Sequence, residues 1–155
     1  MKHIAIAGLG VVGGGVAEIL LKNAALLEKN AGEPIALKAI YTRHPKTDGP
    51  FAPYFVSDFE KIEKDPQIDL VVETIGGSTV AFDLVSRALK AGKHVVTANK
   101  QLIAEHGLEL FALAKAHGVN LLFEASVAGG IPILNPLTRC LGANEITEVS
   151  GILNG

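Results

Sequence analysis

The chain has 155 residues, of which 48% are hydrophobic, and its formal net charge is −2. This length and apolar content suit one domain of ordinary size with a substantial core, and they argue against a disordered chain. The charge is balanced and there is no long basic run, so the sequence does not predict a basic surface that would bind nucleic acid or an anionic membrane. A small-molecule partner is favoured instead. The single cysteine cannot form an internal disulfide, and no apolar run approaches the roughly 18–20 residues of a membrane span. No leader-like segment precedes the first expected strand, so the expected location is the reducing cytoplasm.

The first sixteen residues combine an apolar strand, a glycine-rich turn and the start of a helix. Residues 4–7 form a continuous apolar run, which is typical of a parallel strand buried on both faces. Gly8, Gly10 and Gly13 then match G-x-G-x-x-G, in which the glycines permit a tight turn, close approach of a pyrophosphate and close helix packing. The free N–H groups at the helix start would hold that pyrophosphate. A purely structural glycine turn is the alternative, but the strand-turn-helix context favours a dinucleotide site.

The remaining residues alternate between helical and strand patterns. The expected elements are a helix over 11–30, a strand over 35–41, a loop over 42–57, a short helix to about 64 with Ser57 and Glu60 as a capping box, a strand over 68–73, a helix over 78–91, a strand over 93–97, a helix over 102–117 with Gly107 as a candidate break, a strand over 119–124, a helix over 133–141 and a sixth strand over 145–153. This alternation predicts an α/β fold with a doubly wound, mostly parallel sheet of the Rossmann type in three αβα layers. We expect residues 1–155 to form one dinucleotide-binding domain.

The loop after the second strand bears on the choice between NAD and NADP. In NAD-binding folds an acidic residue at this strand end binds the ribose hydroxyls, whereas a nearby arginine suits the 2′-phosphate of NADP. No acidic residue lies between positions 35 and 47, and Arg43, His44 and Lys46 are available instead. Because a guanidinium forms two charge-assisted hydrogen bonds with phosphate, we expect NADP to be preferred, with NAD as the alternative. A solvated basic loop is the competing interpretation.

Two later strand ends carry candidate site residues. Ligands of doubly wound sheets lie outside the carboxyl ends of the strands, so Thr74 is expected beside the cofactor and Lys100 near the nicotinamide and the substrate. A lysine there would move a proton or orient a developing alkoxide during hydride transfer, unless it is an ordinary solvated lysine. Cys140 is expected to be a buried small hydrophobe within a helix. The five histidines show no ligand spacing for a transition metal.

Five motifs together resemble the nucleotide-binding half of homoserine dehydrogenase. They are GLGVVGGG at 8–15, VETIGG at 72–77, VVTANK at 95–100, EASVAGGIP at 124–132 and GILNG at 151–155. The resemblance covers the whole chain in order, and the last four motifs are more specific than the glycine turn. It implies an oxidoreductase that interconverts L-homoserine and L-aspartate 4-semialdehyde with NAD(P), in the biosynthesis of threonine, methionine and isoleucine.

The same resemblance implies roles for individual residues. Arg43 would meet the adenosine end of the cofactor, Thr74 would line the nicotinamide side, and Lys100 would be a catalytic or substrate-orienting lysine. The implied cofactor-binding set is Gly8, Leu9, Gly10, Val11, Val12, Gly13, Arg43, Thr74 and Lys100.

The loop at 124–132 resembles the family's site for a structural monovalent cation such as sodium. Glu124, Val127, Gly129 and Ile131 stand at the positions that offer oxygens to that ion. A turning loop can direct several hard carbonyl oxygens inward, which makes the spacing physically reasonable. A plain turn of small residues before a helix is the alternative.

The chain departs from the family in length. In the family, the closing Asn-Gly leads into a substrate-binding and dimerisation segment with a further catalytic lysine and acidic residues, which these residues do not include. The resemblance therefore implies a domain that binds nucleotide but turns over little alone, and a full-length enzyme that forms homo-oligomers through the absent part.

Two rival functions remain at this point. Another dehydrogenase of the same fold is the first, although an acylating semialdehyde dehydrogenase needs a cysteine nucleophile and Cys140 has no supporting context. A non-catalytic nucleotide sensor is the second, and such a protein has no use for Lys100.

Overall fold

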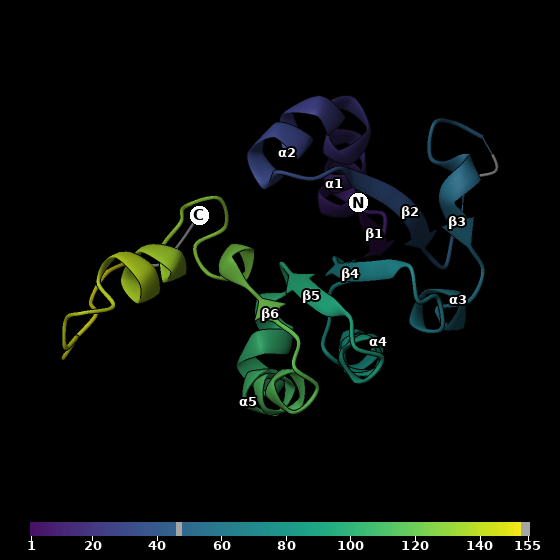
Figure 1. Ribbon diagram of the computed structural model, residues 1–155. Helices are drawn as coiled ribbons and strands as arrows, with labels where there is room; N and C mark the ends of the chain where they lie inside the picture. Colours follow the sequence, from purple (N-terminus) through teal and green to yellow (C-terminus); the bar gives the residue numbers. More distant parts are fainter. Residues whose placement is uncertain (46–47, 153–155) are drawn as a thin grey trace.

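The computed structural model describes residues 1–45 and 48–152, and it places a central sheet between two layers of helices (Figure 1). The strands are β1 Lys2–Ala7, β2 Ile35–Tyr41, β3 Phe55–Val56, β4 Ile68–Glu73, β5 His94–Thr97 and β6 Leu121–Leu122. The helices are α1 Val11–Lys22, α2 Ala24–Ala31, α3 Glu60–Glu63, α4 Thr79–Lys90 and α5 Lys100–Ala116. Short 3-10 turns cover Ala52–Tyr54 and Glu124–Ser126, and a π-helical turn covers Pro136–Cys140.

The six strands form one sheet in the order β3-β2-β1-β4-β5-β6, and every neighbouring pair is parallel. The chain starts in the middle with β1, winds outward to β3, and returns to β4 on the other side of β1. The carboxyl ends of β1 and β4 therefore lie at the point where the winding direction changes, which is where open α/β sheets bind ligands. The predicted Rossmann-type fold is confirmed.

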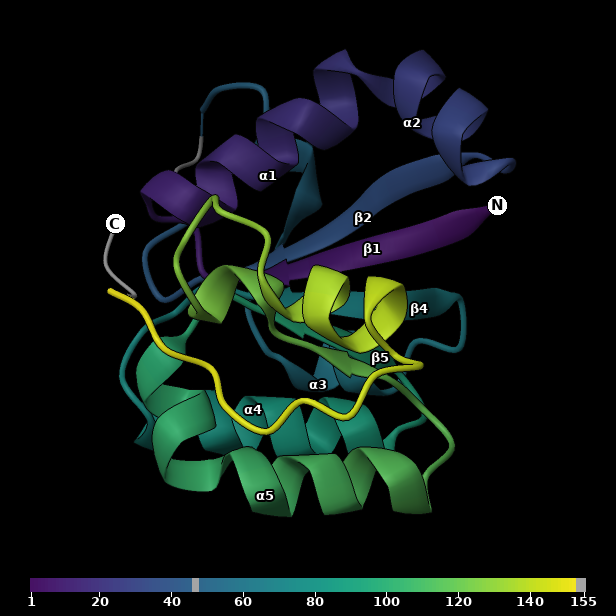
Figure 2. The ribbon, with the colours of Figure 1, turned by 90° about the vertical axis from the view of Figure 1, so that its left-hand side faces the viewer.

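The two faces of the sheet bury different residues because side chains alternate along each strand. In β1, Ile4 and Ile6 pack with Ala17 and Leu20 of α1, while Ala5 and Ala7 belong to the core cluster on the opposite face. Figure 2 shows α1 and α2 on one side of the sheet and α4 and α5 on the other. The continuous apolar run of β1 follows from this burial on both faces.

Several element boundaries differ from the sequence-based expectation. The helix expected over 11–30 is two helices, because the chain leaves helical geometry at Asn23, a residue whose side chain favours caps over helix interiors. The loop expected over 42–57 contains the two-residue strand β3. The Ser57–Glu60 capping box is wrong: α3 begins at Glu60, and the Asp58 carboxylate accepts the Glu60 N–H at 2.9 Å.

Larger corrections fall in the last third of the chain. α5 begins at Lys100 and passes through Gly107 without a break. The strand expected over 119–124 shrinks to β6, and the strand expected over 145–153 is absent from 145–152, while Leu153 lies outside the described residues. The helix expected over 133–141 is the short π-helical turn, and Cys140 on it is exposed rather than buried.

None of the helices in residues 1–45 and 48–152 is both long enough and apolar enough to cross a bilayer.

Candidate functional site

Two cavities open along the edge of the sheet where the strands end. The larger cavity, of about 870 Å³, lies between the start of α1, the loop after β4, the start of α5 and the loop after β6. The smaller cavity, of about 280 Å³, lies between the glycine turn and the end of β2. Thr74 lines both cavities, which makes it the common wall between them.

The glycine turn is held against the loop after β4 by direct backbone contact. Gly8 has a φ of +101°, and a Cβ atom there would lie 2.8 Å from the carbonyl of Thr74. A Cβ atom on Gly13 would lie 2.1 Å from the Gly8 carbonyl oxygen and 2.6 Å from Thr74 Oγ1. Only glycine fits at these two positions, so the turn geometry predicted from the spacing is imposed by sterics.

Gly10 differs from the other two glycines of the motif. A Cβ atom there would meet no atom of this chain within 4 Å, and the residue is the N-cap of α1. The open space leaves room for a ligand at the positive end of the helix, where unpaired N–H groups bind phosphates.

Thr74 fastens the turn from the side. Its hydroxyl donates to the Gly8 carbonyl oxygen at 2.9 Å, and its backbone N–H donates to the Ala7 carbonyl oxygen at 2.8 Å. The side chain that was predicted to face the nicotinamide therefore also fixes the turn through which the chain leaves β1.

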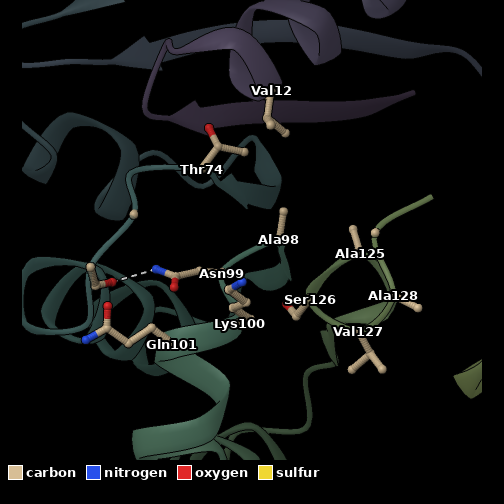
Figure 3. Close-up of a pocket in the computed structure, with 13 residues that line it drawn as sticks. Val12, Thr74, Ala98, Asn99, Lys100, Gln101, Ala125, Ser126, Val127 and Ala128 are labelled. Carbon is tan, nitrogen blue, oxygen red and sulfur yellow. Dashed lines mark hydrogen bonds between the residues drawn. The ribbon is translucent and has the colours of Figure 1, made fainter. Parts of the chain in front are cut away.

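The start of α5 is fixed by Asn99. Its side-chain oxygen accepts the Leu102 N–H at 3.1 Å, the standard N-cap arrangement, and its amide group donates to the Gly77 carbonyl oxygen at 2.6 Å. Asn99 is buried, whereas Lys100, the first residue of the helix, is exposed and lines the larger cavity. Figure 3 shows Lys100 beside Asn99, with the 125–128 loop across the cavity.

Beneath Asn99 lies a buried carboxylate. Glu73, at the end of β4, is fully buried; its carboxylate accepts the Ile75 N–H at 2.7 Å and the Thr97 hydroxyl at 2.6 Å. Thr97 Oγ1 in turn accepts the Asn99 N–H at 3.0 Å. A continuous set of hydrogen bonds thus joins β4, β5 and the start of α5, and of these three side chains only Asn99 lines the larger cavity.

The loop after β6 forms the remaining wall of the larger cavity. Ser126 donates its hydroxyl to the Thr97 carbonyl oxygen at 3.0 Å, and Ala128 has a φ of 58°, which is uncommon for a residue with a Cβ atom. Val127 and Gly129 line the cavity, whereas Ile131 is exposed and lies outside it.

Glu124 uses its carboxylate to hold the turn that follows this loop. The two carboxylate oxygens accept three backbone N–H groups, those of Ile133, Leu134 and Asn135, at 2.6–2.9 Å. Desolvation by itself would raise the pKa of the Glu124 carboxyl, but the three N–H donors outweigh it and lower the pKa below its ordinary value.

The carbonyl oxygens decide whether this loop suits a cation. The Glu124 carbonyl already accepts the Val127 N–H at 3.1 Å, but no N–H group of the described residues donates to the carbonyls of Val127, Gly129 and Ile131. Across the same residues, no three His, Cys, Asp or Glu side chains gather closely enough to hold a metal ion. An ion here would therefore rest on carbonyl oxygens, which suits a hard monovalent cation better than a transition metal.

The structure brings most of the sequence-predicted cofactor residues together. Gly8, Leu9, Gly10 and Arg43 line the smaller cavity, and Val12, Thr74 and Lys100 line the larger one. Gly13 is buried behind the turn and acts through packing. Val11 is almost completely exposed, at 95%; it lines neither of these two cavities but, together with Gly10, a third one of about 630 Å³ beside α1. Lys46 lies outside the described residues.

Three polar residues of the site were missed by sequence reasoning: Glu73, Thr97 and Asn99. Asn99 carried a usable signal, because an asparagine directly before a helical pattern is a preferred N-cap. Glu73 and Thr97 stood at the ends of expected strands, and their pairing depends on β4 and β5 being neighbours in register.

The fold and the paired cavities define a dinucleotide-binding domain of the Rossmann type. A family model for the NAD-binding domain of homoserine dehydrogenase matches residues 8–124. The chain therefore belongs to the homoserine dehydrogenase family and carries its NAD-binding domain.

Individual relatives agree with this family assignment. The homoserine dehydrogenase of Pseudomonas aeruginosa is 47% identical over 154 residues, which cover 98% of this chain and 35% of that protein. The crystal structure of the Thiobacillus denitrificans homoserine dehydrogenase matches with a TM-score of 0.85 and 43% identity, over 92% of this chain and 34% of the other. A hyperthermophilic archaeal homoserine dehydrogenase in complex with NADPH matches with a TM-score of 0.71 and 25% identity, over 88% and 48%. The chain thus spans about a third of the length of the curated relatives it matches.

Proposed function

We propose that residues 1–155 are the single dinucleotide-binding domain of an enzyme that interconverts L-homoserine and L-aspartate 4-semialdehyde. The observation that supports this most directly is the larger cavity, because Lys100 shares it with Val12 of the glycine turn and with Thr74. The ammonium group of Lys100 and the residues expected to contact the nucleotide thus line the same cavity, as a hydride-transfer site requires.

The residues present fit a bound dinucleotide. The turn at Gly8, Gly10 and the start of α1 would hold the pyrophosphate, and Arg43 would lie at the adenosine end in the smaller cavity. The nicotinamide ring, when bound, supplies or accepts the hydride at the carbon that carries the substrate oxygen. In the reducing direction, the Lys100 ammonium would donate a hydrogen bond to that oxygen, stabilise the negative charge that the oxygen gains as hydride adds to the carbon, and supply the proton that completes the alcohol.

The catalytic proposal is tested with Lys100→Ala in the full-length protein. We expect turnover of homoserine to fall by roughly 10²–10³-fold, as on removal of one electrostatic donor, while NADPH affinity stays within about twofold. Steady-state kinetics and a fluorescence titration measure the two quantities. Gln101→Ala, the neighbouring residue on the cavity wall, is the matched control, and an unchanged turnover in Lys100→Ala would remove this residue from the reaction.

We further propose that NADP(H) is preferred over NAD(H). Among the described residues that line it, the smaller cavity holds Arg43 and His44 but no acidic side chain, so the side chains at the end of β2 suit a phosphate better than a ribose hydroxyl. In Arg43→Ala we expect the affinity for NADPH to fall about tenfold and the affinity for NADH to change little. Equal affinities in the parent protein, or equal losses in the variant, would contradict the role of Arg43.

A structural monovalent cation in the 124–131 loop is part of the same proposal. Its support is the set of carbonyl oxygens of Val127, Gly129 and Ile131, to which no described N–H group donates. Replacing sodium by a bulky organic cation in the buffer should then lower the melting temperature of the full-length protein, whereas an unchanged melting temperature would count against the ion.

We propose that the complete enzyme contains parts that these 155 residues do not supply. The chain covers 35% of its Pseudomonas relative, so the substrate-binding part and the homo-oligomer contacts are proposed to lie in the remaining length. The 155 residues alone should bind NADPH without oxidising homoserine, and the complete enzyme is proposed to work in the cytoplasm. Robust homoserine oxidation by the isolated chain would refute the proposal that the substrate-binding part lies outside these residues.

A further inference from the structure

The most unusual polar group of the described chain is the Glu73 carboxylate. It is fully buried at the end of a central strand, and within the described residues no lysine, arginine or histidine forms an ion pair with it. Neither Glu73 nor its partner Thr97 lines the larger cavity. Neither side chain is therefore placed to touch a substrate.

Burial of such a group is unfavourable unless hydrogen bonds replace its contacts with water. Glu73 has these replacements: the Ile75 N–H donates to one oxygen at 2.7 Å and the Thr97 hydroxyl donates to the other at 2.6 Å. Replacing both partners of a buried hydrogen bond by apolar groups of the same shape can leave the stability nearly unchanged. The stability of the sheet alone therefore gives no reason for a carboxylate at this position.

The network does provide a fixed connection between two walls of the larger cavity. From Ile75 it passes through Glu73 and the Thr97 hydroxyl to the Asn99 N–H, and the Asn99 side chain closes it on the Gly77 carbonyl at 2.6 Å. The loop after β4 and the first residues of α5 are thus joined twice. Because Lys100 follows Asn99 directly, the network sets where its backbone begins the helix.

We propose that Glu73 and Thr97 are positioning residues, which hold the start of α5 and Lys100 in register with the 74–77 loop. The inference rests on the proposed hydride-transfer function for its catalytic consequence. It differs from that function in its residues, since these two side chains act through Asn99 rather than on the substrate.

The Thr97 hydroxyl is the best point at which to cut the network. Thr97→Val keeps the shape of the side chain but leaves one Glu73 oxygen and the Asn99 N–H without a partner. Thr97→Ser restores the hydroxyl. Ser86→Ala is the matched control, because Ser86 on α4 also has a buried hydroxyl, and that hydroxyl has no partner among the described residues.

In the full-length protein we expect Thr97→Val to lower kcat for homoserine by about 10–100-fold, since small misplacements of a reacting group have effects of this size. The KM for NADP⁺ in this reaction should stay within about twofold, because the glycine turn is fixed by Thr74 and not by Thr97. Thr97→Ser should recover most of the turnover, and Ser86→Ala should leave it unchanged. A parallel loss of kcat in Ser86→Ala, or no rescue by serine, would show a merely structural role.

A second measurement does not depend on the substrate. Amide hydrogen exchange at Asn99 and Leu102 should become at least about tenfold faster in Thr97→Val and remain normal in Ser86→Ala. If the parent protein fails to oxidise homoserine, the proposed function falls, and the exchange rates alone decide the positioning role. If exchange at both amides is unchanged in Thr97→Val, the positioning role is overturned even when the enzyme is active.

Discussion

The two ends of the proposed cofactor site are held in place by different forces. At the glycine turn, Gly8 and Gly13 lie so close to their neighbours that a methyl group has no room. At the start of α5, the side chains of Glu73, Thr97 and Asn99 hold the backbone through hydrogen bonds. Steric contact tolerates no substitution, whereas a hydrogen-bond network tolerates variants that keep its donors and acceptors.

The largest effect is expected at the glycine turn, which is held by steric contact. In Gly13→Ala the new Cβ atom would lie 2.1 Å from the Gly8 carbonyl oxygen. We expect a loss of about 1–3 kcal/mol of unfolding free energy from overpacking, and NADPH binding should be lost with the displaced turn. Denaturant unfolding and a titration with NADPH measure the two effects.

Gly14→Ala is the control for this variant. The residue is the next one along α1, and a Cβ atom there would meet nothing within 4 Å. Since alanine is a better helix former, Gly14→Ala should gain about 0.5–1 kcal/mol. Equal effects at positions 13 and 14 would contradict the steric account of the turn.

The effect of intermediate size concerns the start of α5, where two substitutions at Asn99 distinguish its two side-chain hydrogen bonds. Asn99→Ala removes both the cap of α5 and the donor to Gly77, and we expect a loss of about 1–2 kcal/mol in unfolding free energy. Asn99→Ser keeps a capping oxygen and loses only the donor to Gly77. It should therefore be the more stable of the two variants in denaturant unfolding, and the reverse order would show that the cap is unimportant.

The smallest effect is a pH dependence at the Glu124 carboxylate. Its pKa is lowered in the folded chain, so its contribution is complete above the ordinary value of 4.5 and is lost as the pH falls through the lower folded value. Amide exchange at Ile133 and Leu134 should therefore become faster, relative to its intrinsic rate, in acid than at neutral pH. In Glu124→Gln this relative rate should not change with pH; a pH response equal to that of the parent would contradict the assignment.

The steric end of the site is the part that sequence predicts well. The spacing of Gly8, Gly10 and Gly13 encodes a local turn, and Arg43 follows β2 at the point where a parallel sheet brings it to the same edge. Local chain geometry and the rules for parallel sheets are enough for these residues.

The polar end depends on contacts between distant elements. The bond between Glu73 and Thr97 exists because β4 and β5 pair with these two residues opposite one another. The pattern of residues 145–152 suggested a strand, but a strand needs a neighbour for its backbone groups, and none of the described strands pairs there. Neither the Glu73–Thr97 hydrogen bond nor the absence of a strand over 145–152 can be predicted from the local sequence pattern.

Both borders of the sheet are formed by strands of only two residues, β3 and β6. Among the described residues, β3 pairs only with Ile40 and Tyr41 at the end of β2, and β6 pairs only with Val95 and Val96 of β5. Very short edge strands are a common protection against aggregation. A strand of another chain that docked directly on β3 or β6 would therefore find only two residues with which to pair.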